Sequence, residues 1–365
     1  MHTRFNIPCM SNNNRKKGVS GLMRVRNERR FIEPCVKSCI DALDELIIVY
    51  NDCTDGSEEV IEKVRQQYPQ KIKVFHYPYK VLGAGLNKEE YECVKKLPLD
   101  SPHLLCNYYN FALSKATYMY AIKIDADQMY FAEVLKEYGD LCRSENFHIS
   151  FFQALLGKGL QLYLSCFRFL SMKLKHSLPL MPDWLASYGA NCYIAYAQEQ
   201  FLKGKACLSF SGLNVFKEND QTYVCLGLRS KLLNVLPPFN GEGDHVLFRI
   251  SDKTYYLPYD MDYYNTQRSF SYSVIEQFIH PFRIMPVGFA WLHLSAERDN
   301  IRDKVSLIKR DNPDSFIKLQ DFTKLSYKNI LKKSDKVMFS LFQRVLFSFV
   351  YKAYRKRLNN DIFGK

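Results

Sequence analysis

Strand-like apolar runs alternate with helical segments over the first third of the chain, and this alternation limits its fold more than any other feature. Residues 45–50 (ELIIVY) form a continuous run rich in β-branched side chains, typical of a strand buried on both faces. Further strands are predicted at residues 19–25, 71–76 and 118–124, and helices at residues 28–43, 57–68 and 106–116. This order predicts right-handed βαβ units and a mainly parallel α/β sheet.

Polar residues follow two of the predicted strands directly. The turn Asn51–Gly56 (NDCTDG) follows the strand at 45–50, and Asp125 and Asp127 follow the strand at 118–124. In parallel sheets ligands bind at the carboxyl ends of the strands, so these groups are expected to converge on one site.

The pair Asp125 and Asp127 carries the strongest chemical signal. Two carboxylates on a turn out of a sheet suit a hard divalent cation, which stabilises the negative charge of a diphosphate leaving group. The alternative interpretation is a solvated turn, because the pattern DxD is common in proteins. Its place after a buried strand favours the functional interpretation.

The chain resembles the family 2 type of GT-A glycosyltransferases over residues 19–130, and more loosely to about residue 295. The resemblance rests on Gly21–Glu28 (GLMRVRNE), Leu43–Gly56 (LDELIIVYNDCTDG), Asn110 and the DxD strand, in matching order and spacing. It implies a GT-A fold, Rossmann-like with a mainly parallel sheet flanked by helices, and here followed by a basic helical C-terminal extension.

The resemblance also implies an inverting transfer of sugar from a nucleotide-sugar, with Mn²⁺ or Mg²⁺ as cofactor. Asp127 would bind the metal, and Asp125 would lie near the donor ribose and share the metal. The residues expected to bind the nucleotide-sugar are Arg24, Arg26, Asn27, Glu28, Asn51, Asp52, Asn110 and Asp125.

One departure from the family concerns recognition of the nucleobase of the donor. The family usually has an aspartate directly after the second strand, and this aspartate contacts the nucleobase. Here Tyr50 stands in that place. A UDP-sugar is still the expected donor, although this departure weakens the implied uracil contact. Asp55 is expected to cap the following helix rather than to contact a ligand.

An inverting enzyme needs a general base for the acceptor hydroxyl. In the family this is an aspartate of a Glu-Asp pair that precedes an apolar helix ending in Arg. The segment Gly241–Arg249 (GEGDHVLFR) is similar, with Gly243 in the middle place. Glu242 and Asp244 are both candidates. Asp244 is favoured because it directly precedes the expected helix, and capping of that helix is its alternative role.

A late histidine completes the metal shell in many GT-A enzymes. His293, in the segment WLHL after an apolar run, is the candidate ligand here, and a structural histidine is the alternative. His245 and His280 are weaker candidates.

Basic charge is concentrated at the C-terminus. Residues 301–365 hold 16 Lys and Arg against 6 Asp and Glu, a net charge of +10, so the other 300 residues carry only +3 of the chain's +13. Residues 332–357 have the pattern of a basic amphipathic helix, which could lie on an anionic membrane or pack on the catalytic domain. This distribution argues against nucleic-acid binding.

Three segments are expected along the chain: a disordered N-terminal segment at 1–17, a catalytic domain at 18–300 and the C-terminal extension at 301–365. The catalytic domain is expected to divide into a nucleotide-binding half at 18–130 and an acceptor half at 131–300. Helices are predicted at 149–175, and strands around a Gly212 turn at 207–226. The acceptor is expected to meet residues 150–188 and the loop around Asn240. A boundary near Asp299 follows from the change to Lys-rich composition.

The N-terminus has no apolar signal-like region, no run of eighteen apolar residues occurs, and the eleven cysteines lack a regular pattern. These features predict a cytoplasmic enzyme with reduced thiols, peripheral on the inner face of the membrane. With the resemblance, they predict a bacterial glycosyltransferase that acts on a saccharide or lipid-linked acceptor in surface polysaccharide or lipopolysaccharide synthesis.

Two other classes remain open from the residues alone. A sugar-nucleotide nucleotidyltransferase would need a Gly-rich phosphate loop, and Gly21–Glu28 has one glycine. A non-enzymatic membrane or nucleic-acid binder that uses the basic tail would leave the converging aspartates without a role.

Overall fold

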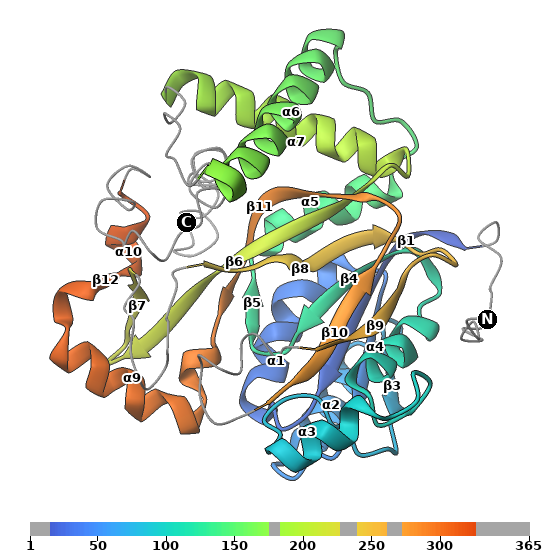
Figure 1. Cartoon of the computed structure of the whole chain (residues 1–365), viewed down its shortest axis with the longest axis vertical. Helices are drawn as coiled ribbons and strands as arrows, with labels where there is room; N and C mark the ends of the chain where they lie inside the picture. Colours follow the sequence, from blue (N-terminus) through green and yellow to red (C-terminus); the bar gives the residue numbers. More distant parts are fainter. Residues whose placement is uncertain (1–14, 175–182, 227–238, 261–271, 326–365) are drawn as a thin grey trace. The chain divides into compact units, whose positions relative to one another are not determined.

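The computed structural model describes residues 15–174, 183–226, 239–260 and 272–325 (Figure 1). The predicted helix at 332–357 lies outside these ranges. The chain forms two compact units: the first unit holds residues 1–127 and 247–282, and the second unit holds residues 128–246 and 283–365. Residues 247–282 thus return to the first unit after the second has begun, an interleaving that the sequence pattern did not indicate.

A parallel four-stranded sheet forms the centre of the first unit. Its strands are β1 (Lys16–Val25), β2 (Glu45–Tyr50), β3 (Ile72–His76) and β4 (Tyr118–Asp125). They lie in the order β3-β2-β1-β4, all parallel. The last residues of β8 (Phe239–Arg249) pair antiparallel with β4. Side chains 46–49 of β2 are fully buried, which confirms the predicted burial on both faces. The mainly parallel α/β sheet is therefore confirmed.

The predicted helices of the first unit are also confirmed. They are α1 (Arg29–Cys39), α2 (Ser57–Gln67) and α4 (Leu105–Ser114). α1 and α2 pack against each other, and α4 contacts β1 and β2. Two elements were not predicted: α3 (Lys88–Lys95) and a hairpin of β9 (Tyr255–Asp260) and β10 (Val274–Ile279). This hairpin packs on α4.

Glu45 holds the amino end of the parallel sheet together. Its buried carboxylate accepts hydrogen bonds from Ser20 Oγ (2.6 Å), from the Thr117 backbone N–H (2.6 Å) and from Thr117 Oγ1 (2.8 Å), and it pairs with Lys73 Nζ (2.5 Å). Burial opposes ionisation, but the hydrogen bonds from Lys73, Ser20 and Thr117 outweigh it and lower the pKa of Glu45. One side chain thus connects β1, β2, β3 and the start of β4.

The second unit is built on β6 (Ala206–Glu218) and β11 (Arg283–His293), which pair in parallel, with β5 (Gln128–Tyr130) antiparallel to β11. The turn predicted at Gly212 is wrong, because β6 runs straight through it. The chain turns instead at Asn219 and Asp220, which have φ values of 48° and 58°. Gly212 is needed for packing, since a Cβ there would overlap the Trp291 indole.

The helices α5 (Ala132–Arg143), α6 (Phe151–Leu174) and α7 (Asp183–Leu202) belong to the second unit. The helix predicted at 149–175 is therefore confirmed. α6 and α7 pack closely at Gly157, where a Cβ would collide with the Tyr196 side chain and the Cys192 carbonyl. The glycine permits the two helices to approach.

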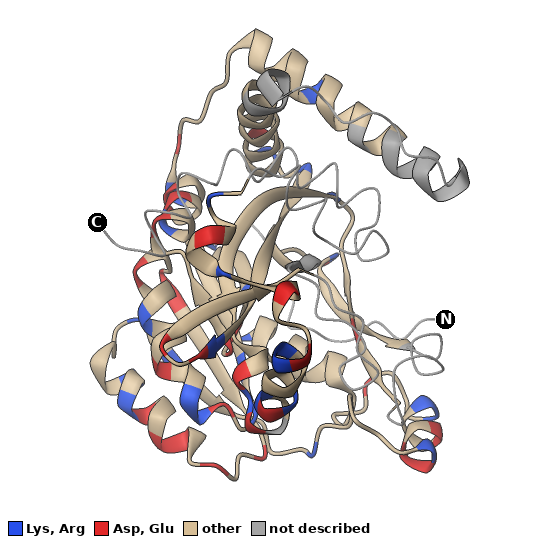
Figure 2. Ribbon diagram, turned by 90° about the vertical axis from the view of Figure 1, so that its left-hand side faces the viewer, with Lys and Arg blue, Asp and Glu red and all other residues tan. Residues whose placement is uncertain are grey.

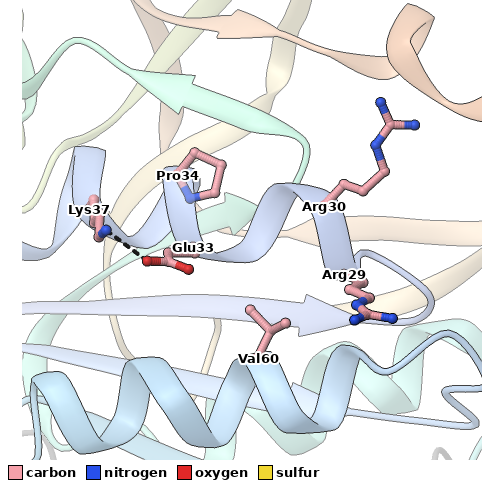
Figure 3. Close-up of a pocket in the computed structure, with 6 residues that line it drawn as sticks. All are labelled: Arg29, Arg30, Glu33, Pro34, Lys37 and Val60. Carbon is pink, nitrogen blue, oxygen red and sulfur yellow. Dashed lines mark hydrogen bonds and ion pairs between the residues drawn. The ribbon is translucent and has the colours of Figure 1, made fainter.

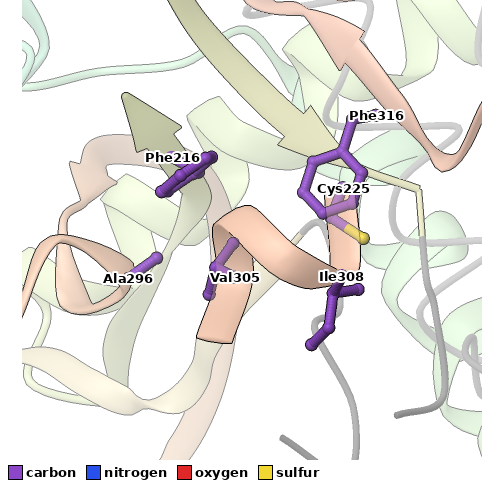
Figure 4. Close-up of a cluster of buried hydrophobic side chains, with 6 residues drawn as sticks. All are labelled: Phe216, Cys225, Ala296, Val305, Ile308 and Phe316. Atoms are coloured by element: carbon purple, nitrogen blue, oxygen red, sulfur yellow. The ribbon is translucent and has the colours of Figure 1, made fainter. Parts of the chain in front are cut away.

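The composition change near Asp299 marks the start of α9 (Asp299–Asp311), which packs into the second unit. Buried side chains of β6, β7 (Gln221–Cys225), α9 and β12 (Phe316–Lys318) meet in one cluster (Figure 4). Its members are Phe216, Cys225, Ala296, Val305, Ile308 and Phe316. The first part of the predicted C-terminal extension therefore shares a core with β6, and α10 (Leu319–Phe322) follows β12.

Two further expectations concern the chain as a whole. β1 begins at Lys16, inside the segment expected to be disordered, and residues 1–14 lie outside the described ranges. None of the helices in the described ranges has both the length and the apolarity needed to cross a bilayer. Within the same ranges no disulfide links two cysteines.

Candidate functional site

The carboxyl edge of the parallel sheet places two predicted site residues, Arg24 and Asp125, side by side. In the strand register Arg24 of β1 lies opposite Asp125 of β4 on one side and Val49 of β2 on the other. The next pairs, Val25 with Tyr50 and Tyr50 with His76, end the strands. The convergence predicted from the sequence therefore occurs within the first unit.

Asp125 is held in a cluster of buried charges. Its Oδ1 pairs with Arg24 at 3.1 Å and its Oδ2 with Lys123 at 3.6 Å, and Lys123 also pairs with Glu276 at 3.7 Å. The side chains of Arg24 and Lys123 are only 10% and 6% exposed. We call these four residues and Tyr109 the Asp125 cluster.

The Tyr109 ring packs against the two cations of this cluster, Arg24 and Lys123. The guanidinium of Arg24 lies 3.0 Å from the Tyr109 ring centroid, and Lys123 Nζ lies 5.5 Å from it. Burial alone would lower the pKa of Arg24, but Tyr109 and Asp125 raise it above its usual value, so the guanidinium stays charged. Asp125 is therefore fixed in position by its own unit.

Asp127 lies two residues beyond, on the turn that follows β4, and is buried. Cys35 of α1 reaches the same turn, with its Sγ 3.4 Å from the Asp125 carbonyl oxygen. Burial raises the pKa of the Cys35 thiol, and Cys39, Asp127 and Asp125 raise it further. The thiol is therefore neutral, and through it α1 contacts the backbone at the end of β4.

The loop after β1 is joined to the turn after β2. Arg26 pairs with Asp52 at 3.0 Å, on the exposed surface. Asn27 takes a left-handed conformation (φ 57°), and its Oδ1 accepts a hydrogen bond from the Thr54 N–H at 2.7 Å. The Glu28 N–H donates to Ser57 Oγ. Four predicted nucleotide-binding residues thus lie in two loops that hold each other.

Asp55 caps two helices, which confirms its expected structural role. Its Oδ1 accepts from the Ser57 N–H at 2.9 Å, at the start of α2, and its Oδ2 accepts from the Arg29 N–H at 3.0 Å, at the start of α1. These bonds lower the pKa of Asp55 despite burial.

Asn51, which directly follows β2, is buried, and its side-chain amide is only partly hydrogen-bonded. Its buried Nδ2 donates to the Tyr77 and Tyr79 carbonyls at 2.8 and 2.6 Å, while its Oδ1 is buried and has no hydrogen-bond partner in the described structure. A buried acceptor in that state is costly, so a bound donor would be favoured there. Beside it, the Tyr50 ring lies 5.0 Å from the His76 ring.

The Asn110 side chain is hydrogen-bonded to the backbone of β9. Its Nδ2 donates to the Tyr256 carbonyl at 2.9 Å, and its Oδ1 accepts from the Tyr256 N–H at 2.8 Å. The side chain is buried. The structure therefore places Asn110 where it positions β9 against α4, next to Tyr109.

The remaining predicted residues, except His280, belong to the second unit. Glu242 and Asp244 lie in β8, so the helix expected after Asp244 is wrong: residues 246–249 continue a strand. Residues 247–249 pair with β4 instead of forming a helix. Capping of that helix by Asp244 is excluded for the same reason.

The three histidines differ in their surroundings. His293 Nδ1 lies 2.6 Å from Asn214 Oδ1, so a ring that donates from Nδ1 keeps the lone pair on Nε2, the nitrogen that a metal would use. His245 Nε2 lies 2.8 Å from Gln128 Nε2, and the His245 ring packs at a tilt against Trp291, with ring centroids 4.4 Å apart. Burial lowers the pKa of His280. His245 is thus engaged within the core.

Three members of the Asp125 cluster were missed from the sequence. Lys123 interrupts the apolar strand YMYAIKI, and a lysine in a buried strand was a signal that could have been used. Tyr109 and Glu276 carried no local signal, because only the fold brings residue 276 to the sheet.

The donor set gives a partial fit to a divalent cation. Both oxygens of Asp125 are engaged by cations, so Asp125 is a poor ligand. The charges of Arg24, Lys123, Asp125 and Glu276 cancel, and Asp127 adds a further carboxylate on the turn, the ligand type that Mg²⁺ and Mn²⁺ prefer. No group of three or more potential ligands is preformed within the ranges that the structure describes.

A separate shallow pocket of about 410 Å³ lies between α1 and α2 (Figure 3). Its lining residues are Arg29, Arg30, Glu33, Pro34, Lys37 and Val60. Hydrogen bonds from Lys37 and Lys63 lower the pKa of Glu33 to about 2, so these charges neutralise one another. None of the predicted catalytic residues lines this pocket.

Comparison with known proteins gives one family match. Residues 10–155 match the model of the family described as beta-1,4-N-acetylgalactosaminyltransferase (CgtA). This match covers β1 to β5 and confirms the resemblance to glycosyltransferases over these residues. No curated protein matches the chain.

Solved structures with local similarity include S. aureus TarS and glucosyl-3-phosphoglycerate synthase from Mycobacterium tuberculosis. TarS is 18% identical over 34% of this chain and 19% of its own, with a TM-score of 0.23. The synthase, in complex with Mg²⁺ and UDP, is 18% identical over 32% of this chain and 34% of its own, with a TM-score of 0.21. The similar part thus spans only 19% and 34% of those two chains.

Proposed function

We propose, from the premise that residues 10–155 are part of a glycosyltransferase domain of the GT-A type, that this chain transfers a sugar from a nucleotide-sugar donor. The observation that carries this proposal is the Asp125 cluster. A buried arginine and a buried lysine fix one aspartate at the carboxyl edge of a parallel sheet, where such folds bind ligands. A structural ion pair alone would not need to lie at that edge.

In this proposal the donor lies along the ends of β1, β2 and β4. Asp125 accepts a hydrogen bond from a ribose hydroxyl, and the Arg26–Asn27–Glu28 loop lies beside the nucleotide with Asp52. The Asn51 Oδ1 atom accepts a hydrogen bond from the base, and Tyr50 offers its ring to the base face. An imino N–H, as in uracil, is the donor that this oxygen needs, which supports a UDP-sugar. Asn110 acts indirectly, by holding β9 against α4.

A divalent cation, Mn²⁺ or Mg²⁺, is part of the proposal. Asp127 would hold it, and His293 is the proposed imidazole ligand. When bound, the cation supplies charge stabilisation for the departing diphosphate. Asp125 contributes less directly to holding the cation, since Arg24 and Lys123 pair with its two carboxylate oxygens.

The transfer is proposed to invert the anomeric centre. A carboxylate removes the proton from the acceptor hydroxyl while that oxygen attacks the anomeric carbon from the face opposite the nucleotide. Asp244 is the proposed base and Glu242 the second candidate. Both residues lie in β8, on either side of Gly243. The acceptor is a saccharide or lipid-linked saccharide of a surface polysaccharide or lipopolysaccharide.

The test of the donor site is a thermal-shift panel of UDP, GDP, CMP and dTDP, each with and without Mn²⁺. Stabilisation by UDP that requires Mn²⁺ is expected, by about 2.7 kcal/mol at a ligand concentration one hundred times Kd. The Tyr50→Ala variant should retain the metal requirement and lose selectivity among bases. Absence of any nucleotide-dependent shift would contradict the donor site.

The test of the base compares Glu242→Gln with Asp244→Asn. The variant that lacks the base should lose on the order of 10²-fold or more in kcat, with unchanged UDP binding. The other variant is the matched control, because it makes the same change from carboxylate to amide in the same strand. Equal, small losses in both variants would place the base elsewhere.

The proposed setting is the cytoplasmic face of a membrane, through the basic segment at 332–357. A second candidate function is not favoured by any feature of the described structure.

A further inference from the structure

α6 carries a stripe of large apolar side chains that face solvent. Phe151, Phe152, Leu155 and Leu162 are 75%, 76%, 60% and 53% exposed. Positions 151, 155 and 162 are spaced by four and seven residues, so they lie on one side of the helix. Gly159 and Cys166 continue this side and are also exposed. We call this side of α6 the apolar stripe.

The opposite side of α6 is already used for packing. Gly157 and Leu160 are buried, and Gly157 allows the close approach of α7 at Cys192 and Tyr196. This packing fixes which side of α6 faces outward. The apolar stripe is therefore exposed as a consequence of the helical hairpin, and not because the whole helix lacks a partner.

The charge of α6 is of one sign. Its 24 residues include Lys158, Arg168 and Lys173 and no aspartate or glutamate. Lys158 is exposed and lies between Leu155 and Leu162 along the sequence of the stripe. Figure 2 shows the absence of acidic residues along the part of this helix that it colours. The surface thus combines large apolar groups with basic charge.

This combination selects one kind of partner. A second copy of the chain would bring its own α6 cations against these, which is unfavourable. An anionic bilayer surface accepts both features, because aromatic and leucine side chains insert at the acyl boundary while lysine extends its ammonium group to the head groups. Helices within the described ranges are not apolar enough to cross a bilayer, so α6 would lie along its surface.

We propose that the apolar stripe of α6 is a membrane-docking surface that inserts Phe151, Phe152, Leu155 and Leu162 into the interface of a bilayer containing anionic lipid. This surface is distinct from the segment at 332–357. It lies in the second unit and shares no residue with the proposed donor site. Its test is a binding measurement that does not depend on catalytic activity.

The first experiment is co-sedimentation of the full chain with vesicles of phosphatidylcholine, with and without phosphatidylserine. Binding to the anionic vesicles that weakens with salt is expected. The double variant Phe152→Glu, Leu155→Glu should reduce the vesicle affinity by about tenfold or more. Leu99→Glu is the matched control, because Leu99 is 51% exposed and lies in the first unit. It should bind as the parent does.

Two further variants separate charge from apolar insertion. Lys158→Glu should weaken binding to anionic vesicles severalfold and leave binding to neutral vesicles unchanged. Lys88→Glu, at an exposed position of α3, is its control. Leu155→Trp gives a positive readout, since its tryptophan emission should shift to shorter wavelength on vesicle addition if the stripe inserts. This variant keeps a large apolar side chain and is expected to fold.

Three results would overturn the proposal. The first is vesicle binding that the α6 substitutions leave unchanged and that Arg355→Glu, Lys356→Glu, Arg357→Glu abolishes, which would assign it to the C-terminal segment. The second is an unshifted Leu155→Trp emission at saturating anionic vesicles. The third is a dimer of the parent chain that Leu155→Glu dissociates in sedimentation velocity, which would make the stripe an interface between copies.

Discussion

The two ends of the parallel sheet in the first unit both hold a carboxylate in a network, but they hold it differently. At the amino end the Glu45 side chain is 2% exposed and receives its hydrogen bonds from Ser20, Thr117 and Lys73. At the carboxyl end Asp125 is 27% exposed, although its partners Arg24 and Lys123 are almost buried. The networked carboxylate is therefore shielded from solvent at the amino end and accessible to solvent at the carboxyl end.

This difference separates a structural role from a binding role. Glu45 joins four strands and has its charge fully satisfied by the chain, so it can only stabilise the fold. Asp125 has cations fixed behind it and solvent in front, and Asp127 follows on the same turn. A carboxylate that is positioned by buried cations and still exposed is suited to meet a ligand. The predictions below test this distinction.

The largest effect is expected at the open end. Asp127→Ala should reduce turnover by 10³-fold or more, on the order expected when a group that holds a catalytic cation is lost. The variant should still fold, and its melting temperature measures what the loss of this buried carboxylate costs. Activity assays across Mn²⁺ concentrations check this, and full activity in the variant would remove Asp127 from the metal site.

Asp125→Ala should affect both function and stability. Removal of the carboxylate leaves Arg24 and Lys123 buried with a single anion, Glu276, which costs about 2–4 kcal/mol after allowance for the partial exposure of Asp125. Urea unfolding measures this loss, and UDP thermal shift measures the loss of donor binding. Lys123→Met in the same background should recover part of the stability and none of the binding. A stable variant that binds UDP normally would contradict the positioning role.

Glu45→Gln should affect stability alone. The amide keeps the shape but loses the charge that accepts from Lys73, so the free energy of unfolding should fall by about 2–3 kcal/mol. The activity of the folded fraction at low temperature should match the parent. A selective loss of kcat with unchanged stability would reverse the comparison between the two ends.

The smallest effect is in pH dependence. The folded-state pKa of Glu45 is lowered, so its stabilising contribution is complete above the unfolded-state pKa of about 4.3 and is lost as the pH falls through the folded value. The difference in unfolding free energy between the parent and Glu45→Gln should therefore be largest at neutral pH and shrink as the pH falls through the folded-state pKa of Glu45. A constant difference between them across this range would show that Glu45 does not carry the acid sensitivity.

The sequence was a good guide wherever the determining interactions are local. The strand at 45–50 was predicted from its continuous run of β-branched residues, and the helix at 57–68 from its amphipathic pattern. Asp55 was predicted as a cap of the helix that follows it, and its partner Ser57 lies two residues away. It was a poor guide at Gly212 and at residues 246–249, where strand pairing with distant residues overrides local preference. An apolar run as short as residues 246–248 does not by itself distinguish a helix from a strand.

The sequence by itself determined the order of strands and helices, the position of the DxD turn at a strand end and the concentration of basic charge at the C-terminus. Each follows from the period, the turn chemistry or the composition of a continuous stretch of chain. Only the tertiary structure decided that Lys123, Tyr109 and Glu276 surround Asp125, and that α6 turns its apolar stripe outward. The physical reason is that these contacts join residues far apart in the sequence, such as Lys123 and Glu276, or depend on which helix face a neighbour covers.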